Sequence, residues 1–158
     1  MAQIRSMESR VGRENQRYGP QGERLVAGIV AVSADRTQVL MIQSTGPGGW
    51  VLPKGGWEFD ESAEDAACRE AWEEAGIHCT IYKDLGLIPE MRGSADLLTA
   101  QAPKASYQFF EASVDREEPV WPESYKRQRQ WVDYAQAAQA LASRPELLEA
   151  LNRSSLKR

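Results

Sequence analysis

Three glutamates in this chain, Glu70, Glu73 and Glu74, are spaced so that they share one face of a helix. Residues three and four positions apart on a helix have Cβ atoms about 5–6 Å from each other, so the three carboxylates repel one another. A hard divalent cation removes this repulsion, and Mg²⁺ prefers oxygen ligands and keeps some waters or substrate phosphates. The spacing therefore predicts a magnesium site, with Mn²⁺ or Zn²⁺ as substitutes.

The helix that carries these acids is expected over residues 62–75. Ser62 is a good N-cap and Gly76 a suitable stop. The turn Lys54-Gly55-Gly56 precedes the helix, and glycine lets backbone groups approach a phosphate or a metal. Apolar runs and turn signals predict the other elements. Strands are expected at 25–32, 39–42, 50–53, 79–87, 106–114 and 129–132, and helices at 134–142 and 146–152. The first two strands are expected to form a hairpin.

The chain has 158 residues, enough for one ordinary domain with a core. Strands around a few helices, without regular βαβ alternation, indicate an α/β (α+β) fold in which a mixed sheet lies between helices. We expect a polar lead-in over residues 1–22, a single domain over 23–154 and a frayed tail over 155–158. The net charge of −4 argues against nonspecific binding of nucleic acid.

Cellular location is predicted from what the sequence lacks. Cys68 and Cys79 match no disulfide framework and no zinc motif, so they are expected to be ordinary thiols in a reducing compartment. No apolar run approaches the roughly 20 residues that span a bilayer, and the first residues lack an apolar signal core. We therefore expect an intracellular protein, and the sequence leaves a cytoplasmic and a nuclear location open. We also expect it to act as a monomer.

The acids belong to a longer pattern, G-x5-E-x7-R-E-U-x-E-E-x-G-U, where U is apolar. It is matched by Gly55, Glu61, Arg69, Glu70, Glu73, Glu74, Gly76 and Ile77. Only Ala71 stands where a larger aliphatic residue is usual. A solvated acidic helix face would explain the glutamates alone, but neither the glycine pair nor the spacing of Glu61 and Arg69.

This pattern resembles the Nudix box. The resemblance implies the Nudix fold and the hydrolysis of a diphosphate that is linked to another group. It further implies that Glu70 and Glu74 hold the metal, and that Glu73 activates water beside Glu70 as the second catalytic residue. Such chemistry relies on neutralising charge and orienting water rather than on covalent help from the protein.

Further segments resemble the diphosphoinositol polyphosphate phosphohydrolases, among them WVLPKGGWE, PESYKRQRQWV and RPELLEALNRS. The fungal members of that family are the most similar, and they are also described as diadenosine hexaphosphate hydrolases. The resemblance implies as substrates diphosphoinositol polyphosphates and diadenosine penta- and hexaphosphates, with internal cleavage of inorganic polyphosphate. Such anions need several cations beyond the metal. The expected substrate-binding residues are Arg24, Ser44, Lys54, Gly55, Gly56, Lys104, Arg127, Arg129 and Arg144.

Other readings stay open at this point. The substrate could be another diphosphate, such as a nucleotide sugar, a capped RNA end or a shorter dinucleoside polyphosphate. A noncatalytic polyphosphate sensor is a third reading, against which the complete set of glutamates argues. Arg13 and Arg17 could be tail charges or ligand contacts, His78 is expected at the surface, and Trp57 is the best candidate for a ring that faces a ligand. The long polar loop 89–103 is of a length typical of functional loops.

Overall fold

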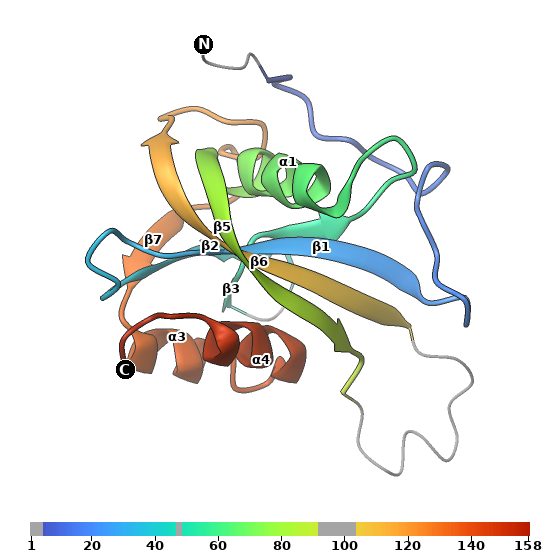
Figure 1. Ribbon diagram of the computed structural model, residues 1–158. Coiled ribbons are helices and arrows are strands. Elements are labelled where there is room, and N and C mark those ends of the chain that lie inside the picture. Colours follow the sequence, from blue (N-terminus) through green and yellow to red (C-terminus); the bar gives the residue numbers. More distant parts are fainter. Residues whose placement is uncertain (1–4, 47–48, 92–103) are drawn as a thin grey trace.

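The computed structural model describes residues 5–46, 49–91 and 104–158, and its strands form two sheets (Figure 1). One sheet has the order β4-β1-β6-β5, made of Lys54–Gly56, Arg24–Ala31, Ala105–Glu117 and Ile77–Pro89. The other has the order β3-β2-β7, made of Trp50–Val51, Val39–Gln43 and Arg129–Val132. Strands β1 and β6 are parallel, whereas the other pairs are antiparallel, so the larger sheet is mixed.

The helices cover the sheets from two sides. Helix α1 (Ala63–Ala75) lies on one side, and helices α3 (Tyr134–Ala140) and α4 (Pro145–Arg153) lie together on the other (Figure 1). The predicted α+β fold, a mixed sheet between helices, is confirmed. Within the described ranges, no helix combines the length and the apolar character that crossing a membrane requires.

Small side chains bring α1 close to the sheet. Ala66, Ala67 and Ala71 are fully buried, and the helix packs mainly on β1, β4 and β5. The apolar run of β1 is buried on both faces, as expected for a strand in the middle of a sheet. Ser62 accepts a hydrogen bond from the Asp65 N–H, and Gly76 ends the helix in the left-handed conformation. Both predicted ends of this helix are therefore confirmed to within one residue.

The predicted hairpin of the first two strands is wrong. Strands β1 and β2 belong to different sheets, and a single bridge between Val32 and Val39 joins their ends. β1 instead pairs along its whole length with β6, which is far away in the sequence. The turn at 35–37 thus connects one sheet to the other. The local sequence does not reveal whether such a turn joins two paired strands or two sheets.

The C-terminal residues differ from the frayed tail expected over 155–158. Leu156 is 4% exposed, and the Lys157 N–H donates to the Arg36 carbonyl at 2.8 Å. The Ser155 N–H donates to the Glu111 carboxylate at 2.8 Å, and the hydroxyls of Ser155 and Tyr82 donate to the same group. Glu111 is fully buried in β6, so these bonds satisfy a charge inside the fold.

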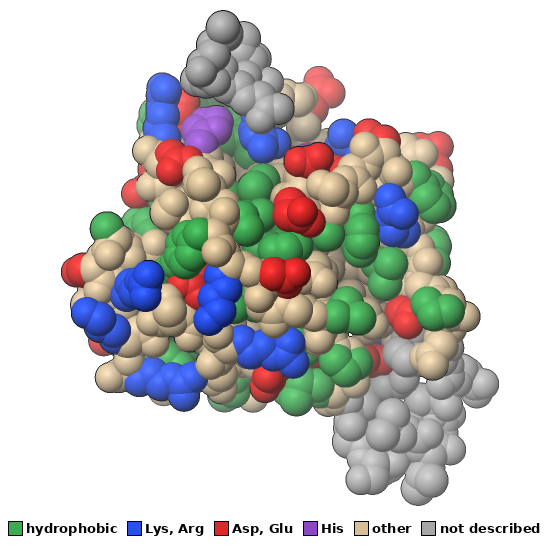
Figure 2. Space-filling view, viewed as in Figure 1, with side chains coloured by type: hydrophobic (Ala, Val, Ile, Leu, Met, Phe, Trp, Pro, Cys, Tyr) green, Lys and Arg blue, Asp and Glu red, His purple; other side chains and the backbone are tan. Residues whose placement is uncertain are grey.

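The surface mixes charges of both signs on the face shown in Figure 2, with several Lys and Arg side chains gathered towards the C-terminal helices. A mixed surface agrees with the modest net charge of −4. Most of the loop predicted to be functional at 89–103 lies outside the described residues, from residue 92 onward. The three glutamates that carry the predicted chemistry lie on α1, which packs against β4.

Candidate active site

The three glutamates of α1 are largely removed from solvent. Glu70 is 8% exposed and Glu73 4%, while Glu74 is half-buried. Burial, reinforced by the neighbouring Glu74 carboxylate, raises the pKa of Glu70 to about 8. Burial also raises the pKa of Glu74 to about 7, against the pull of Arg127, and raises the pKa of Glu73 against the pull of Arg69. Such shifts mark crowded negative charge that a cation would relieve.

Arg69 holds this acidic face together from within. Its guanidinium makes two bonds of 2.8 Å to the Glu61 carboxylate, one of 3.0 Å to Glu70 and two of 3.2 Å to Glu73. It also donates to the Gly56 carbonyl at 2.8 Å. One planar cation thus fixes three carboxylates and ties α1 to β4. Glu61 and Arg69 of the recognised pattern therefore position the other acids.

The glycine pair of β4 is required by close approach. Gly55 lies directly over the Glu70 carboxylate, which a Cβ at that position would overlap. A Cβ at Gly56 would overlap the Gln16 side chain and crowd the Arg24 guanidinium at 2.9 Å. The backbone can therefore lie this close to the Glu70 carboxylate at Gly55, and to the Gln16 side chain at Gly56, because glycine has no Cβ. The Lys54 N–H donates to Glu74 at 3.0 Å and orients this third carboxylate.

A polar cleft of about 300 Å³ opens between α1, β4 and the chain before β7. All three glutamates line it, together with Ser44, both glycines and five cationic side chains: Arg10, Arg24, Lys54, Arg127 and Arg144. Arg127 bonds Glu123 at 2.8 Å and Glu74 at 3.4 Å. Burial lowers the pKa of Lys54 and of Arg24, so an anion that entered the cleft would relieve both. The cleft thus places buried carboxylates beside partly buried cationic side chains whose charged form an anion would stabilise.

Two of the expected binding residues lie elsewhere. Among the described residues that line the cleft, neither Lys104 nor Arg129 appears. Arg129 packs 4.3 Å from the centre of the Trp121 ring and donates to the Ala75 carbonyl at 2.8 Å, at the end of α1. Lys104 is exposed before β6, and its carbonyl accepts from the Arg24 N–H at 3.0 Å. Arg129 therefore holds a helix end, and Lys104 supports the strand that carries Arg24.

The N-terminal segment contributes contacts that sequence reasoning missed. The Arg10 N–H donates to Glu73 at 3.2 Å, and the Ser9 hydroxyl donates to Glu123 at 2.7 Å. Glu123 is 8% exposed and, like Arg10, lines the cleft. The sequence signal that could have pointed to Glu123 is its i,i+4 spacing from Arg127, with which it forms an ion pair. Arg10 offers no such signal, because its partner lies 63 residues away.

The residues left open by the sequence have structural partners. Trp57 is not among the described residues that line the cleft, and its indole N–H donates to the Glu61 carbonyl at 2.9 Å. Arg17 lies 4.8 Å from the centre of that ring and donates to the carbonyls of the loop before α1. His78 stacks on Trp72 with ring centres 5.0 Å apart. These contacts stabilise α1 and the loop before it. Arg13 is exposed.

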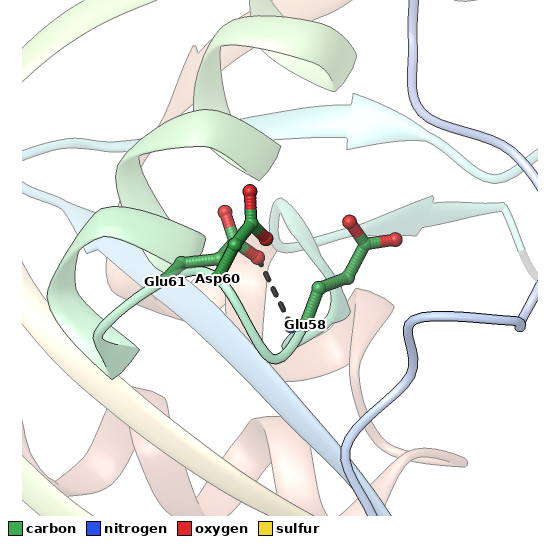
Figure 3. A group of neighbouring side chains, drawn as sticks. All are labelled: Glu58, Asp60 and Glu61. Carbon is green, nitrogen blue, oxygen red and sulfur yellow. Dashed lines mark hydrogen bonds between the residues drawn. The ribbon is translucent and has the colours of Figure 1, made fainter.

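A second acidic group, Glu58, Asp60 and Glu61, lies in the loop before α1 (Figure 3). One carboxylate oxygen of each lies within 4.8 Å of the others. Arg10 pairs with Glu58 at 2.7 Å and with Asp60 at 2.9 Å, while Arg69 takes Glu61. Each carboxylate therefore has an arginine partner, and the group ties the N-terminal segment to the loop.

Comparison with known proteins agrees with this geometry. A model of the NUDIX domain matches residues 22–152. Nudix hydrolase 21, chloroplastic, from Arabidopsis thaliana is 37% identical over 138 residues, which cover 84% of this chain and 67% of that protein. A NUDIX hydrolase from Nitrosomonas europaea has a similar fold, with a TM-score of 0.67 at 16% identity over 83% of this chain and 87% of that one.

An Ap4A hydrolase from C. elegans is also similar, with a TM-score of 0.59 at 25% identity over 82% of this chain and 93% of that one. The family model spans most of the chain and includes α1, Arg69 and the glycine pair. The chain therefore belongs to the Nudix family and is a hydrolase of phosphoanhydride bonds.

Proposed function

We propose that this enzyme is a Mg²⁺-dependent hydrolase of highly phosphorylated small molecules. The proposed substrates are diphosphoinositol polyphosphates and diadenosine penta- and hexaphosphates, with inorganic polyphosphate cut internally. One observation carries the proposal: five cationic side chains line the same small cleft as the three glutamates. A substrate with a single diphosphate would need fewer of them.

Three of the cations that line the cleft have no carboxylate partner among the described residues. In the described part of the chain, Arg24, Lys54 and Arg144 take part in no ion pair, although all three line the cleft. The side-chain partner of Arg24 is neutral, since the Arg24 Nε donates to the Gln16 amide oxygen at 2.8 Å. A phosphate that bonds such groups gains charge-assisted hydrogen bonds. Three cations around one cleft, with no ion pair to any described carboxylate, therefore favour a substrate with several phosphates.

The donor set fits a magnesium ion. Glu70 and Glu74 offer carboxylate oxygens, the ligand type that Mg²⁺ prefers. Their pKa values are raised by burial, which bound positive charge would reverse. Glu70 and Glu74 would thus hold the ion, with the Gly55 backbone beside them. When bound, Mg²⁺ supplies charge neutralisation at the phosphate oxygens.

Glu73 is the proposed general base, and it would accept a proton from the attacking water. Its carboxylate lines the cleft and is held by Arg69 and by the Arg10 N–H, so its orientation is set before a substrate arrives. Burial raises its pKa, which makes it a stronger base near neutral pH. Arg127 and Lys54 would meanwhile position the phosphates.

Substrate class is tested with a panel of pure compounds in Mg²⁺. The panel holds a diphosphoinositol pentakisphosphate, diadenosine tetra-, penta- and hexaphosphate, a nucleotide sugar and a capped RNA. Arg24→Ala and Arg144→Ala each remove a charged hydrogen bond worth about 1.5–3 kcal/mol, so kcat/KM should fall about 10- to 100-fold for the most phosphorylated substrates. Arg116→Ala, a change at an exposed ion pair, serves as the control. Equal losses on the nucleotide sugar would overturn the proposal.

A shorter dinucleoside polyphosphate is the second candidate. The C. elegans protein that resembles this chain is described as an Ap4A hydrolase, and diadenosine tetraphosphate carries several charges as well. Fastest turnover of the tetraphosphate in the same panel would favour this candidate. The cytoplasmic or nuclear location, the monomeric state and the preference for Mg²⁺ over Mn²⁺ or Zn²⁺ stay predictions.

A further inference from the structure

Two free thiols lie next to each other at the side of α1. Cys68 comes from the middle of this helix and Cys79 from the start of β5. Their Sγ atoms are 3.6 Å apart, in contact but not bonded. Both side chains are half-buried, so small reagents in solution can reach them. The fold thus presents a pair of thiols where the sequence suggested two unrelated ones.

The pair is separated from the acids by the helix itself. Cys68 precedes Glu70 by two residues, and two residues turn about 200° around a helix. The thiols therefore face β5, whereas the acids face β4 and the cleft. The cleft residues include neither cysteine among those described, so this pair is not part of the hydrolytic machinery.

Little movement is needed to join the two sulfurs. A disulfide bond has a length of about 2.05 Å, so the atoms must approach by about 1.5 Å. Rotation about the bond between Cα and Cβ of each cysteine can supply part of this approach, because that bond sets the position of each sulfur. Both elements are already packed against each other, so the cross-link would join parts that stay together.

We propose that Cys68 and Cys79 form a redox-active dithiol site, oxidised to an intramolecular disulfide by peroxides. In the first step a peroxide takes two electrons from one thiol, whose sulfur gains an oxygen to become a sulfenic acid, and hydrogen peroxide leaves as water. The second thiol then attacks that sulfur, the S–S bond forms, the S–O bond breaks, and a second water leaves with the remaining proton. A small dithiol returns the pair to the reduced form by exchange.

The cross-link should be visible as a gain in stability. It closes a short loop between positions 68 and 79, which restricts the unfolded chain. For a chain of this size we expect the melting temperature to rise by about 5 °C or more. In a reducing compartment the bond would be short-lived, and would persist only while the oxidant is present.

The test treats the folded protein with hydrogen peroxide, blocks free thiols and digests it with trypsin. Cleavage after Lys54, Arg69 and Lys83 places the two cysteines in separate peptides, 55–69 and 70–83. The expected product is these two peptides joined by a disulfide, lost after dithiothreitol. Cys68→Ser and Cys79→Ser are the controls and should yield neither the product nor the rise in melting temperature.

Three results would overturn the proposal. The thiols of the folded protein could oxidise separately to sulfinic acids with no linked peptide. Linked peptides could form only between two molecules, which a dimer of doubled mass would reveal. The linkage could also form as fast in guanidinium chloride as in the folded protein, which would mean that the fold does not create the pair.

Discussion

Replacement of Arg69 by methionine should destabilise the fold more than any other single change in the site. Arg69 is 8% exposed and bonds Glu61, Glu70 and Glu73 at 2.8–3.2 Å. Methionine keeps the length of the side chain but leaves three buried carboxylates without their cation. Loss of one partner of a buried ion pair costs about 3–5 kcal/mol. At about 2–4 °C per kcal/mol for a chain of this size, the melting temperature should fall by about 6–20 °C.

The assay is thermal unfolding followed by circular dichroism, in EDTA so that no metal replaces the lost charge. Arg116→Met is the matched control, since Arg116 pairs with Glu118 at 2.7 Å but its side chain is 63% exposed. An exposed pair contributes at most about 1 kcal/mol. Arg69→Lys should fall between the two, because a compact ammonium cannot bridge three carboxylates.

Comparison of the two methionine variants distinguishes the loss of a buried ion network from the loss of an exposed charge. If Arg69→Met melts within the range of Arg116→Met, the idea that Arg69 holds the acids together is refuted. If Arg69→Met fails to fold at all, Arg69→Lys carries the test, and it should lose hydrolytic activity while still folding. Wild-type activity in Arg69→Lys would mean that the orientation of Glu73 and Glu70 does not depend on the guanidinium.

Three further changes test the cleft. Glu73→Gln should lower kcat by about 10²–10⁴-fold at an unchanged melting temperature, because it removes the proposed base; wild-type kcat would assign the proton to another group. Gly55→Ala should lower kcat/KM by about 10²-fold, since its Cβ displaces the Glu70 carboxylate, whereas Gly46→Ala, with open space around it, should leave kcat/KM unchanged; similar losses in both would count against the close approach. EDTA should stop turnover and Mg²⁺ should restore it and raise the melting temperature, so turnover that persists in EDTA would exclude a metal-dependent reaction.

The parts of the structure that were foreseen from sequence are those with local signals. Helix α1 has a side-chain cap at Ser62 and a left-handed glycine at Gly76, and both act within a few residues of the chain. The fold class followed from the order of apolar runs, and the recognised pattern named the acids. Arg24, Lys54, Arg127 and Arg144, which the wider resemblance brought forward, all line the cleft.

What was missed depends on contacts between distant parts of the chain. Whether a strand pairs with its neighbour or with one eighty residues away is set by the packing of the whole core, so β1 and β2 could not be assigned to different sheets. Arg129 is close to Arg127 in sequence, yet Arg129 lies in β7 and packs on Trp121, whereas Arg127 lies before that strand and lines the cleft. The bond from the Arg10 N–H to Glu73 involves a backbone group, which has no side-chain signature.

The buried carboxylate of Glu111 has a consequence for how this protein is made. Two of its three donors belong to Ser155, which lies 44 residues further along the chain, so on the ribosome β6 is synthesised well before these two groups. Until then Glu111 has only the Tyr82 hydroxyl among its three donors, and a buried carboxylate that is only partly hydrogen-bonded is costly, so Glu111 must stay hydrated. The central sheet should therefore close late in synthesis, once the segment around Leu156 has docked, and a nascent chain that lacks this segment should remain sensitive to proteases.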